Sequence, residues 1–133
     1  MGGIDLSNHI YIASPYSHRN KEIVEERYQA VMKYEIHLIK KHFITYSPIV
    51  HCHNMAKIGG LPTDAAYWMS RNFAMIKSAR ELHVLQLPGW NGSIGVNAEI
   101  SFWRTLSGYD PFFIDPENYS PVPSLISPKE ETK

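Results

Sequence analysis

Apolar residues follow two different periods along this chain, and segments of the two kinds alternate. Steps of three and four residues between apolar positions, typical of one helix face, predict helices over residues 20–41 and 64–79. A third helix is predicted over residues 95–107, because Gly108 supplies the residue type that commonly ends a helix. Short runs of β-branched and aromatic residues predict strands over residues 9–13, 43–46, 82–87 and 111–114.

This alternation predicts one α/β domain over residues 1–114, a doubly wound parallel sheet of four to five strands with helices on both faces. The segment 49–62 mixes His, Asn, Gly and Pro and predicts a loop with at most a short helix. Residues 115–133 contain four prolines and end in charged residues, so we expect an extended or partly disordered tail. Because parallel sheets bind ligands beyond the carboxyl ends of their strands, a site is expected in three loops: 14–20, 47–63 and 88–94.

The composition narrows the classes of function. Among the 133 residues, 13 Lys and Arg balance 13 Asp and Glu, so the chain lacks the basic charge that binds nucleic acid polymers or membranes. Cys52 is the single cysteine, which excludes an internal disulfide and a cysteine-based zinc site. No apolar run approaches the roughly 18 residues of a membrane span, and the N-terminus lacks the pattern of a signal peptide. We therefore expect a soluble, cytoplasmic, single-domain protein.

The segment 88–99, with the sequence PGWNGSIGVNAE, carries the most informative chemistry. A turn containing Gly92, Ser93 and Gly95 leads into a predicted helix, where free backbone N–H groups and the helix dipole suit a phosphate. Glu99 is expected in about the first helical turn, where the dipole favours its ionised form. A charged carboxylate beside a phosphate-binding loop can attack a carbon centre. The alternative is a solvated Glu99, with Ser93 acting only as the N-cap.

Hydroxyl groups gather at the end of the first predicted strand. Tyr11 lies on that strand, and Ser14, Tyr16 and Ser17 follow in the loop. Clustered hydroxyls at the carboxyl end of a strand can bind a sugar or a phosphate. The alternative for Tyr11 is ordinary half-buried packing.

His51 and His53 lie two residues apart in the loop predicted after the second strand. On an extended segment both side chains can face the same way, as in a metal site, but the sequence offers no convincing third ligand, and we expect no metal. The alternative is that they line a pocket as polar residues. Trp68 and Trp90 flank the expected cleft, where each either stacks on a base or packs in the core.

Three segments together resemble the nucleoside 2-deoxyribosyltransferase superfamily: IYIASP at 10–15, YSPIVH at 46–51 and SIGVNAE at 93–99. The Ser-x-Gly-x-x-x-Glu arrangement of the last segment is closely similar to that of the deoxynucleoside 5′-monophosphate N-glycosidases. The resemblance spans residues 9–108. It implies a flavodoxin-like fold, cleavage of an N-glycosidic bond without a cofactor, and a homodimer or larger homo-oligomer in which a neighbour completes each site.

Residue by residue, the resemblance implies that Glu99 is the nucleophile on C1′ of the sugar. It also implies that Tyr11 orients this carboxylate or contacts the sugar, and that Ser93 binds the 5′-phosphate. Recognition through Ser93 favours a nucleotide over a free nucleoside. The residues also fit this chemistry without the resemblance. Departure of a base leaves an oxocarbenium-like sugar, which a close carboxylate stabilises or captures.

Asn72 marks a departure from these relatives, which carry an Asp on the helix before the third strand. The position is found by counting back from Ala79. Because an amide cannot donate a carboxylic acid proton, help for the leaving base is left to hydrogen bonding, to Asp64, or to His51 or His53.

We therefore expect an N-glycosidase that hydrolyses the base–sugar bond of a (deoxy)nucleoside 5′-monophosphate. One alternative is a deoxyribosyltransferase that exchanges bases on free deoxynucleosides. The other is a non-catalytic nucleotide-binding or sensing module. Asn72 favours this last alternative, whereas Glu99, Ser93 and Tyr11 argue against it.

Overall fold

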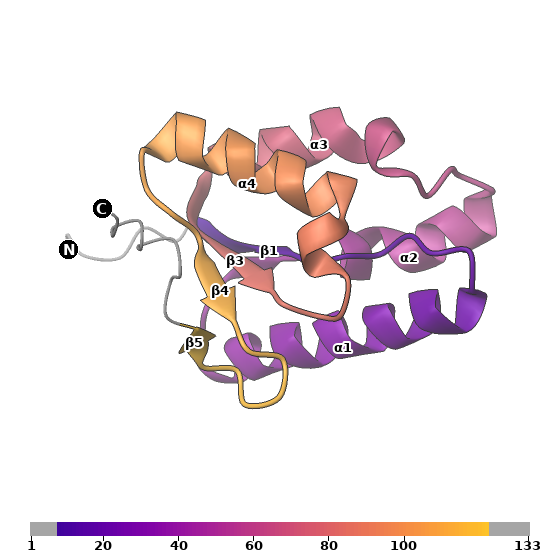
Figure 1. Cartoon of the computed structure of the whole chain (residues 1–133), viewed down its shortest axis with the longest axis horizontal. Helices are drawn as coiled ribbons and strands as arrows, with labels where there is room; N and C mark the ends of the chain where they lie inside the picture. Colours follow the sequence, from indigo (N-terminus) through magenta and orange to yellow (C-terminus); the bar gives the residue numbers. More distant parts are fainter. Residues whose placement is uncertain (1–7, 123–133) are drawn as a thin grey trace.

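The computed structural model describes residues 8–122. The helices are α1 (Lys21–Lys40), α2 (Pro48–Gly59), α3 (Ala65–Lys77) and α4 (Ile94–Ser107), with a 3₁₀ turn, η1 (Trp90–Gly92), before α4. The strands are β1 (His9–Ala13), β2 (Thr45–Tyr46), β3 (Ala79–Leu85), β4 (Phe112–Ile114) and β5 (Pro121–Val122). They form one five-stranded sheet in the order β2-β1-β3-β4-β5 (Figure 1).

The sheet is doubly wound. β1 pairs in parallel with β2 and β3, β4 adds a further parallel strand, and β5 closes the edge antiparallel to β4. α1 covers one face of the sheet, and α3 and α4 cover the other (Figure 1). The predicted flavodoxin-like α/β fold with helices on both faces is thus confirmed. The strand order reverses between β1 and β3, which is where sheets of this kind bind ligands.

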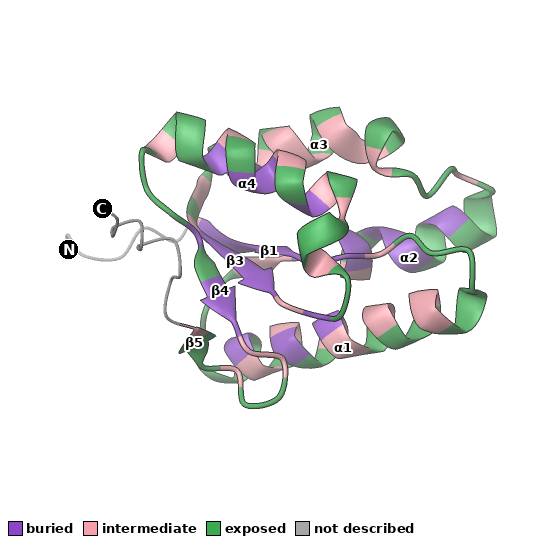
Figure 2. Cartoon of the chain, in the orientation of Figure 1, coloured by how far each residue is buried: buried purple, intermediate pink, exposed green. Residues whose placement is uncertain are grey.

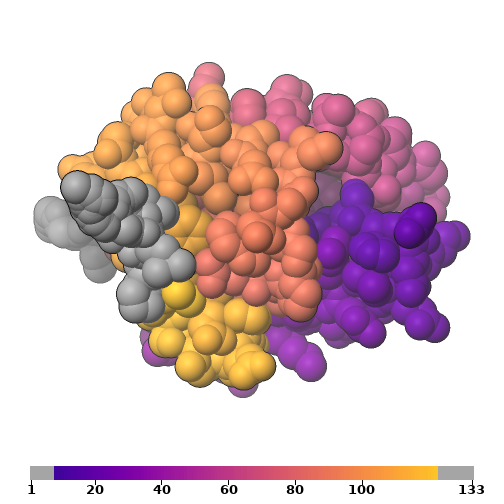
Figure 3. Space-filling model, viewed as in Figure 1, coloured from indigo at the N-terminus to yellow at the C-terminus, as the bar shows by residue number. Residues whose placement is uncertain are grey.

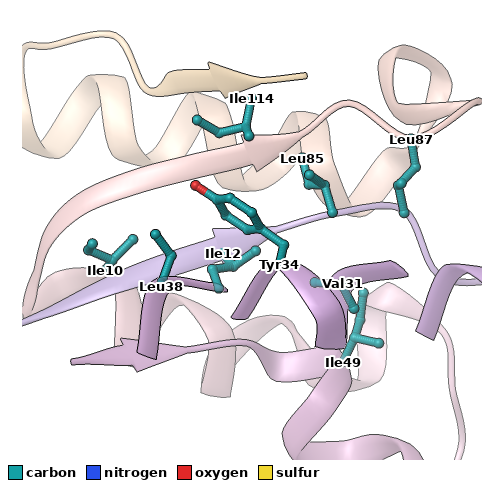
Figure 4. Packing of buried hydrophobic residues seen from close by; sticks show 9 residues of the cluster. All are labelled: Ile10, Ile12, Val31, Tyr34, Leu38, Ile49, Leu85, Leu87 and Ile114. Atoms are coloured by element: carbon teal, nitrogen blue, oxygen red, sulfur yellow. The ribbon is translucent and has the colours of Figure 1, made fainter. Parts of the chain in front are cut away.

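β1 separates the two halves of the core. All five of its residues are buried, as expected for a central parallel strand. Ile10 and Ile12 pack with Leu38 of α1 on one face (Figure 4), whereas Tyr11 and Ala13 join the core beneath α3 and α4. Because side chains alternate along a strand, Tyr11 points to the face on which α4 lies.

Each of the four α-helices begins at a polar residue whose side chain accepts a backbone N–H: Asn20, Ser47, Asp64 and Ser93. Such caps typically contribute about 1 kcal/mol each. α4 ends at Gly108, which has a φ of 79° and is the predicted stop residue. The helix boundaries therefore follow from local sequence chemistry.

The segment 49–62 is not the loop that the sequence predicts, because it contains the helix α2. This helix begins after Ser47, has Pro48 in its first turn, and stops at Gly60, whose φ of 67° needs a glycine. Its two His and one Asn, together with the nearby Gly and Pro residues, are more typical of a loop. Its buried residues nevertheless recur at helical spacing: Ile49, Cys52, His53 and Ala56.

Other differences from the predicted elements are small. β3 begins at Ala79, earlier than predicted, and β2 is shorter than predicted. Residues 115–122, assigned to the tail, turn back and add β5 to the sheet. The expectations for the extreme N-terminus and for the rest of the tail fall on residues 1–7 and 123–133, outside the described part.

The surface shows where the connecting loops meet. Buried residues concentrate in the strands and on the inner sides of the helices, and exposed residues lie on their outer sides (Figure 2). On the face in Figure 3, the segment after β3 lies against the loop that joins β1 to α1. None of the helices within residues 8–122 has the length and apolar character needed to cross a membrane.

Candidate active site

A cavity of about 550 Å³ opens at the carboxyl edge of the sheet, where the three predicted loops converge. Ten of the thirteen residues that the sequence singles out line it: Ser14, Tyr16, Ser17, His53, Asp64, Asn72, Gly92, Ser93, Gly95 and Glu99. Tyr11, His51 and Trp90 do not line it. The volume suits a ligand of ordinary small-molecule size.

Glu99 lines this cavity and is itself buried. Its side chain is 5% exposed, so it is not the solvated residue of the alternative interpretation. The hydroxyl of Tyr11, itself fully buried, donates to Glu99 Oε2 at 2.5 Å, and Asn72 Nδ2 lies 3.4 Å from the same oxygen. Tyr11 therefore holds the carboxylate without lining the cavity itself.

The electrostatics of Glu99 differ from those expected from sequence. α4 begins at Ile94, so Glu99 lies beyond the first turn, where the helix dipole has little effect. Burial raises the pKa of Glu99 to about 7, and the hydrogen bonds from Tyr11 and Asn72 oppose this rise only in part. Burial, and then the Glu99 charge, raises the pKa of Tyr11 well above its ordinary value, so Tyr11 remains a donor. The site holds a basic carboxylate near neutral pH.

This raised pKa predicts a cost in folding stability. The pKa of Glu99 is about 7 in the folded chain against 4.5 ordinarily, so its contribution to stability is present below about pH 4.5 and is lost as the pH rises through 7. Glu99→Gln removes the titration. The variant should be more stable than wild type at pH 8, by up to ~3 kcal/mol, and should gain far less at pH 5. Urea unfolding at both pH values measures this, and an equal difference at the two pH values would contradict it.

Two glycines and the Ser93 cap shape the turn that leads from β3 into α4. Gly89 has a φ of 91°, which favours glycine, and an added Cβ there would lie 2.7 Å from Arg27 Nη2. Ser93 Oγ accepts the N–H of Val96 at 3.2 Å, which leaves its own proton to donate into the cavity. A Cβ on Gly95 would lie 3.2 Å from Ala65 Cβ, so this glycine lets α3 and α4 begin close together.

Arg27 is a cavity residue that sequence reasoning missed. Its guanidinium donates to the carbonyl of Ser17 at 2.9 Å and to the carbonyl of Pro88 at 3.1 Å, and so joins the loops after β1 and β3. Five N–H donors are available on a guanidinium, so further ones remain for a ligand. No motif marks Arg27, because it lies in the middle of α1 and reaches the cavity only through the fold. Cys52 and Thr63 are among the further lining residues that were not predicted.

Two cavity atoms have unused hydrogen-bonding capacity. The Ser14 hydroxyl and Asn72 Oδ1 are buried and have no partner among residues 8–122. Because buried polar atoms are normally satisfied, both lack the partner expected for their burial. Asn72 directs its NH₂ toward Glu99 Oε2. Asp64 also lines the cavity, although its carboxylate is engaged in capping α3 through the N–H of Tyr67.

The structure separates His51 from His53. The sequence interpretation assumed an extended segment, but on the helix α2 two residues at i and i+2 point in nearly opposite directions. His53 is buried at the cavity, whereas His51 is exposed and packs near the Tyr46 ring. Within residues 8–122 there is also no group of three or more His, Cys, Asp or Glu arranged to hold a metal ion.

Trp90 is likewise outside the cavity. It belongs to η1 and packs on Phe113 with ring centroids 5.5 Å apart, so the packing alternative holds for this residue. Trp68 lines the cavity, and its indole N–H donates to the carbonyl of Pro62 at 2.8 Å. Of the two tryptophans, Trp68 is therefore the one that lines the cavity.

The fold and cavity define the class: a flavodoxin-like α/β protein with a buried carboxylate at the carboxyl edge of its sheet. Residues 8–109 match the family described as "Domain of unknown function (DUF1937)", and the chain belongs to this family. A comparison with curated proteins finds no match. Neither the fold nor this family description names an activity, so function has to be argued from the site.

Proposed function

We propose that this protein is an N-glycosidase that hydrolyses the base–sugar bond of a (deoxy)nucleoside 5′-monophosphate. The observation that carries the proposal is Glu99, a buried carboxylate held by Tyr11 in a cavity at the strand-order reversal. A carboxylate with a pKa near 7 is a better nucleophile than an ordinary one and is still ionised in a large fraction of molecules at neutral pH.

In the proposed first step, Glu99 attacks C1′ of the sugar as the C1′–N bond breaks. The base leaves with the electron pair of that bond and takes a proton from solvent, and the sugar stays on Glu99 as an ester. In the second step, water attacks C1′ and gives up a proton as the ester bond breaks, which restores the carboxylate. Two-step hydrolysis by one carboxylate nucleophile follows the chemistry of retaining glycosidases.

The part of the cavity at the start of α4 is suited to the 5′-phosphate. The N-terminus of α4, the Ser93 hydroxyl and the Arg27 guanidinium all face the cavity. An arginine and helix N–H groups are strong phosphate donors. This supports a monophosphate over a free nucleoside.

The base would lie near Asn72 and Trp68. Trp68 would stack on the base, and Asn72, which lines the same cavity, would hydrogen-bond it. Since Asn72 cannot release a proton, it acts on the leaving base by hydrogen bonding alone. His51, one of the groups considered for this task, is excluded by its position on α2.

The proposal includes a relation to the nucleoside 2-deoxyribosyltransferase superfamily, which the motifs around Tyr11 and Glu99 support. It also includes a homo-oligomer and a cytoplasmic location. Ile94 is 81% exposed at the rim of the cavity, as would suit cover by a second copy.

A panel of nucleoside and deoxynucleoside 5′-monophosphates, each with its free nucleoside, tests this proposal. Release of free base from monophosphates without any added base supports hydrolysis. Turnover that requires an added base would instead establish a transferase. Binding without turnover of any panel member would establish a sensing module and overturn the proposal.

Ser93→Ala should weaken binding of a monophosphate more than binding of the matching nucleoside. Loss of the α4 cap affects both ligands alike, whereas a hydrogen bond to a charged phosphate is worth about 1.5–3 kcal/mol, or roughly 10- to 150-fold in Kd. Calorimetric titration of both ligands measures the difference, with Ser101→Ala on the exposed side of α4 as the control. Equal losses for the two ligands would show that Ser93 does not contact the phosphate.

A further inference from the structure

A second titratable cluster lies at the same cavity and has no part in the attack by Glu99. The Tyr16 hydroxyl lies 2.6 Å from His53 Nδ1, and His53 Nε2 lies 3.2 Å from Glu25 Oε1. The three side chains come from the loop after β1, from α2 and from α1. Tyr16 and His53 line the cavity, whereas Glu25 does not.

His53 is held firmly in this cluster. It is 5% exposed, and the Tyr28 ring stacks on its imidazole with centroids 3.8 Å apart and planes at 16°. Glu25 is 48% exposed and also accepts from the Gln29 amide at 2.9 Å. The cluster therefore runs from the cavity wall, through a buried imidazole, to solvent.

The direction of the hydrogen bonds follows from Glu25. An ionised carboxylate only accepts, so His53 Nε2 carries a proton toward it, and neutral His53 must then accept at Nδ1. Tyr16 consequently donates its proton to His53 and keeps its oxygen lone pairs for the cavity. A phenol oriented this way receives a proton from the cavity and cannot supply one to a leaving base.

The same order of groups occurs once more in the described chain, away from the cavity. Tyr34 OH lies 2.7 Å from His83 Nδ1, and His83 Nε2 lies 2.9 Å from Glu81 Oε1. None of these three residues lines the cavity. Such a triad can therefore be purely structural, and the distinguishing feature of the first one is that its tyrosine lines the cavity that contains Glu99.

We propose that Tyr16, His53 and Glu25 form a proton relay that activates the water of the second step. The water oxygen forms its bond to C1′ as the C1′–O bond to Glu99 breaks. The water proton passes to the Tyr16 oxygen while the original Tyr16 proton passes to His53 Nδ1. The His53 imidazolium is then paired with Glu25, whose exposed carboxylate gives the proton a path to solvent.

The surrounding charges are compatible with this relay. Lys57 and the Gln29 amide act on Glu25 from outside, and both hold the pKa of Glu25 below its ordinary value, Gln29 more strongly. Tyr28 and Cys52 face Tyr16, and burial is the main reason that the pKa of Tyr16 is raised. Tyr16 therefore stays a phenol and passes a proton on without becoming a free phenolate.

The relay rests on the proposed glycosidase function and makes a sharper claim, that water is the intended acceptor. Tyr16→Phe removes only the oxygen through which the proton passes. Release of base in the first turnover should stay within about threefold of wild type, whereas hydrolysis of the sugar ester should slow by ~100-fold or more. The variant should show a burst of one base per site, and intact-protein mass spectrometry should show a sugar phosphate retained on the protein.

Tyr34→Phe is the matched control, because it breaks the same kind of hydrogen bond in the triad away from the cavity. It should lower stability without a burst and without retained sugar. Glu25→Gln should give a weaker burst than Tyr16→Phe, since the imidazole keeps a hydrogen-bond partner but loses its counter-charge.

The outcomes separate this inference from the function on which it rests. If wild type releases no base, both fail. If wild type releases base and Tyr16→Phe hydrolyses nucleotide at the wild-type rate, or slows both steps equally, the relay is wrong and the glycosidase stands. A Tyr16→Phe burst matched by Tyr34→Phe would also overturn the relay.

Discussion

Replacing Glu99 by Gln is expected to abolish base release while nucleotide binding survives. The amide has nearly the shape of the carboxylate, so Tyr11 can still donate to its oxygen, and the cavity wall is unchanged. The amide is not a nucleophile, however, and removing a nucleophile costs about 10³-fold or more in kcat. Quenched-flow measurement of free base, with calorimetric titration of the same nucleotide, separates the two effects.

Glu22→Gln provides the control for this substitution. Glu22 is exposed in the first turn of α1 and does not line the cavity. The Glu22→Gln variant should release base at the wild-type rate. Base release by Glu99→Gln within about tenfold of wild type would remove Glu99 from the role of nucleophile.

The second large effect is expected at Asn72. In wild type the ionised form of Glu99 reacts, so kcat/KM should rise as pH increases through about 7 and then level off. Asn72→Asp would place a second carboxyl group beside Glu99 Oε2, from which the Asn72 amide nitrogen is 3.4 Å away. The two carboxyl groups would titrate as a coupled pair, and the form that carries one proton contains both a carboxylate and an acid.

This coupling predicts a new descending limb in the pH profile of Asn72→Asp. Above the second pKa of the pair the acid proton is lost, and the rate should fall about tenfold for each further pH unit. The preference among bases should also change, because a carboxyl group now faces the base. Asn54→Asp, on the exposed side of α2, is the matched control. Profiles of wild type and Asn72→Asp that superimpose, with the same substrate ranking, would place Asn72 outside the site.

The alternation of strand and helix periods along the sequence was sufficient to predict the α/β fold. These periods depend on which side of each element is buried. It also located the cavity, since parallel sheets present their loops at one edge. α2 was missed because two His and one Asn interrupt its apolar residues. The boundary signals at Pro48 and Gly60 were present but were taken as marks of a loop.

Some site residues can be predicted from a local motif, whereas others come together only through packing of distant segments. Ser93 and Glu99 lie on one local motif, so their proximity could be predicted from spacing. His51 was misplaced because the secondary structure of its segment was wrong, and a two-residue step means opposite faces on a helix. Arg27 and the contact between Tyr16 and His53 depend on packing of distant segments, for which a single sequence gives no signal.

The pKa of Glu99 is a further property that the sequence does not reveal. The effect of the helix dipole on Glu99 can be estimated from the position of this residue along α4. Its burial, however, depends on how β1, α3 and α4 pack around the side chain. Desolvation of a fully buried carboxylate outweighs a dipole contribution of about 0.3–1 kcal/mol. Tertiary burial therefore decides the charge state on which the proposed chemistry depends.

The most direct test of the proposed function is identification of the products from the best-bound deoxynucleoside or nucleoside 5′-monophosphate. Chromatography with mass detection should find free base and sugar 5-phosphate in equal amounts, in proportion to the enzyme added, and neither product with Glu99→Gln. A substrate that binds in the cavity and remains intact, or that yields nucleoside and inorganic phosphate instead, would contradict cleavage of the base–sugar bond by this protein.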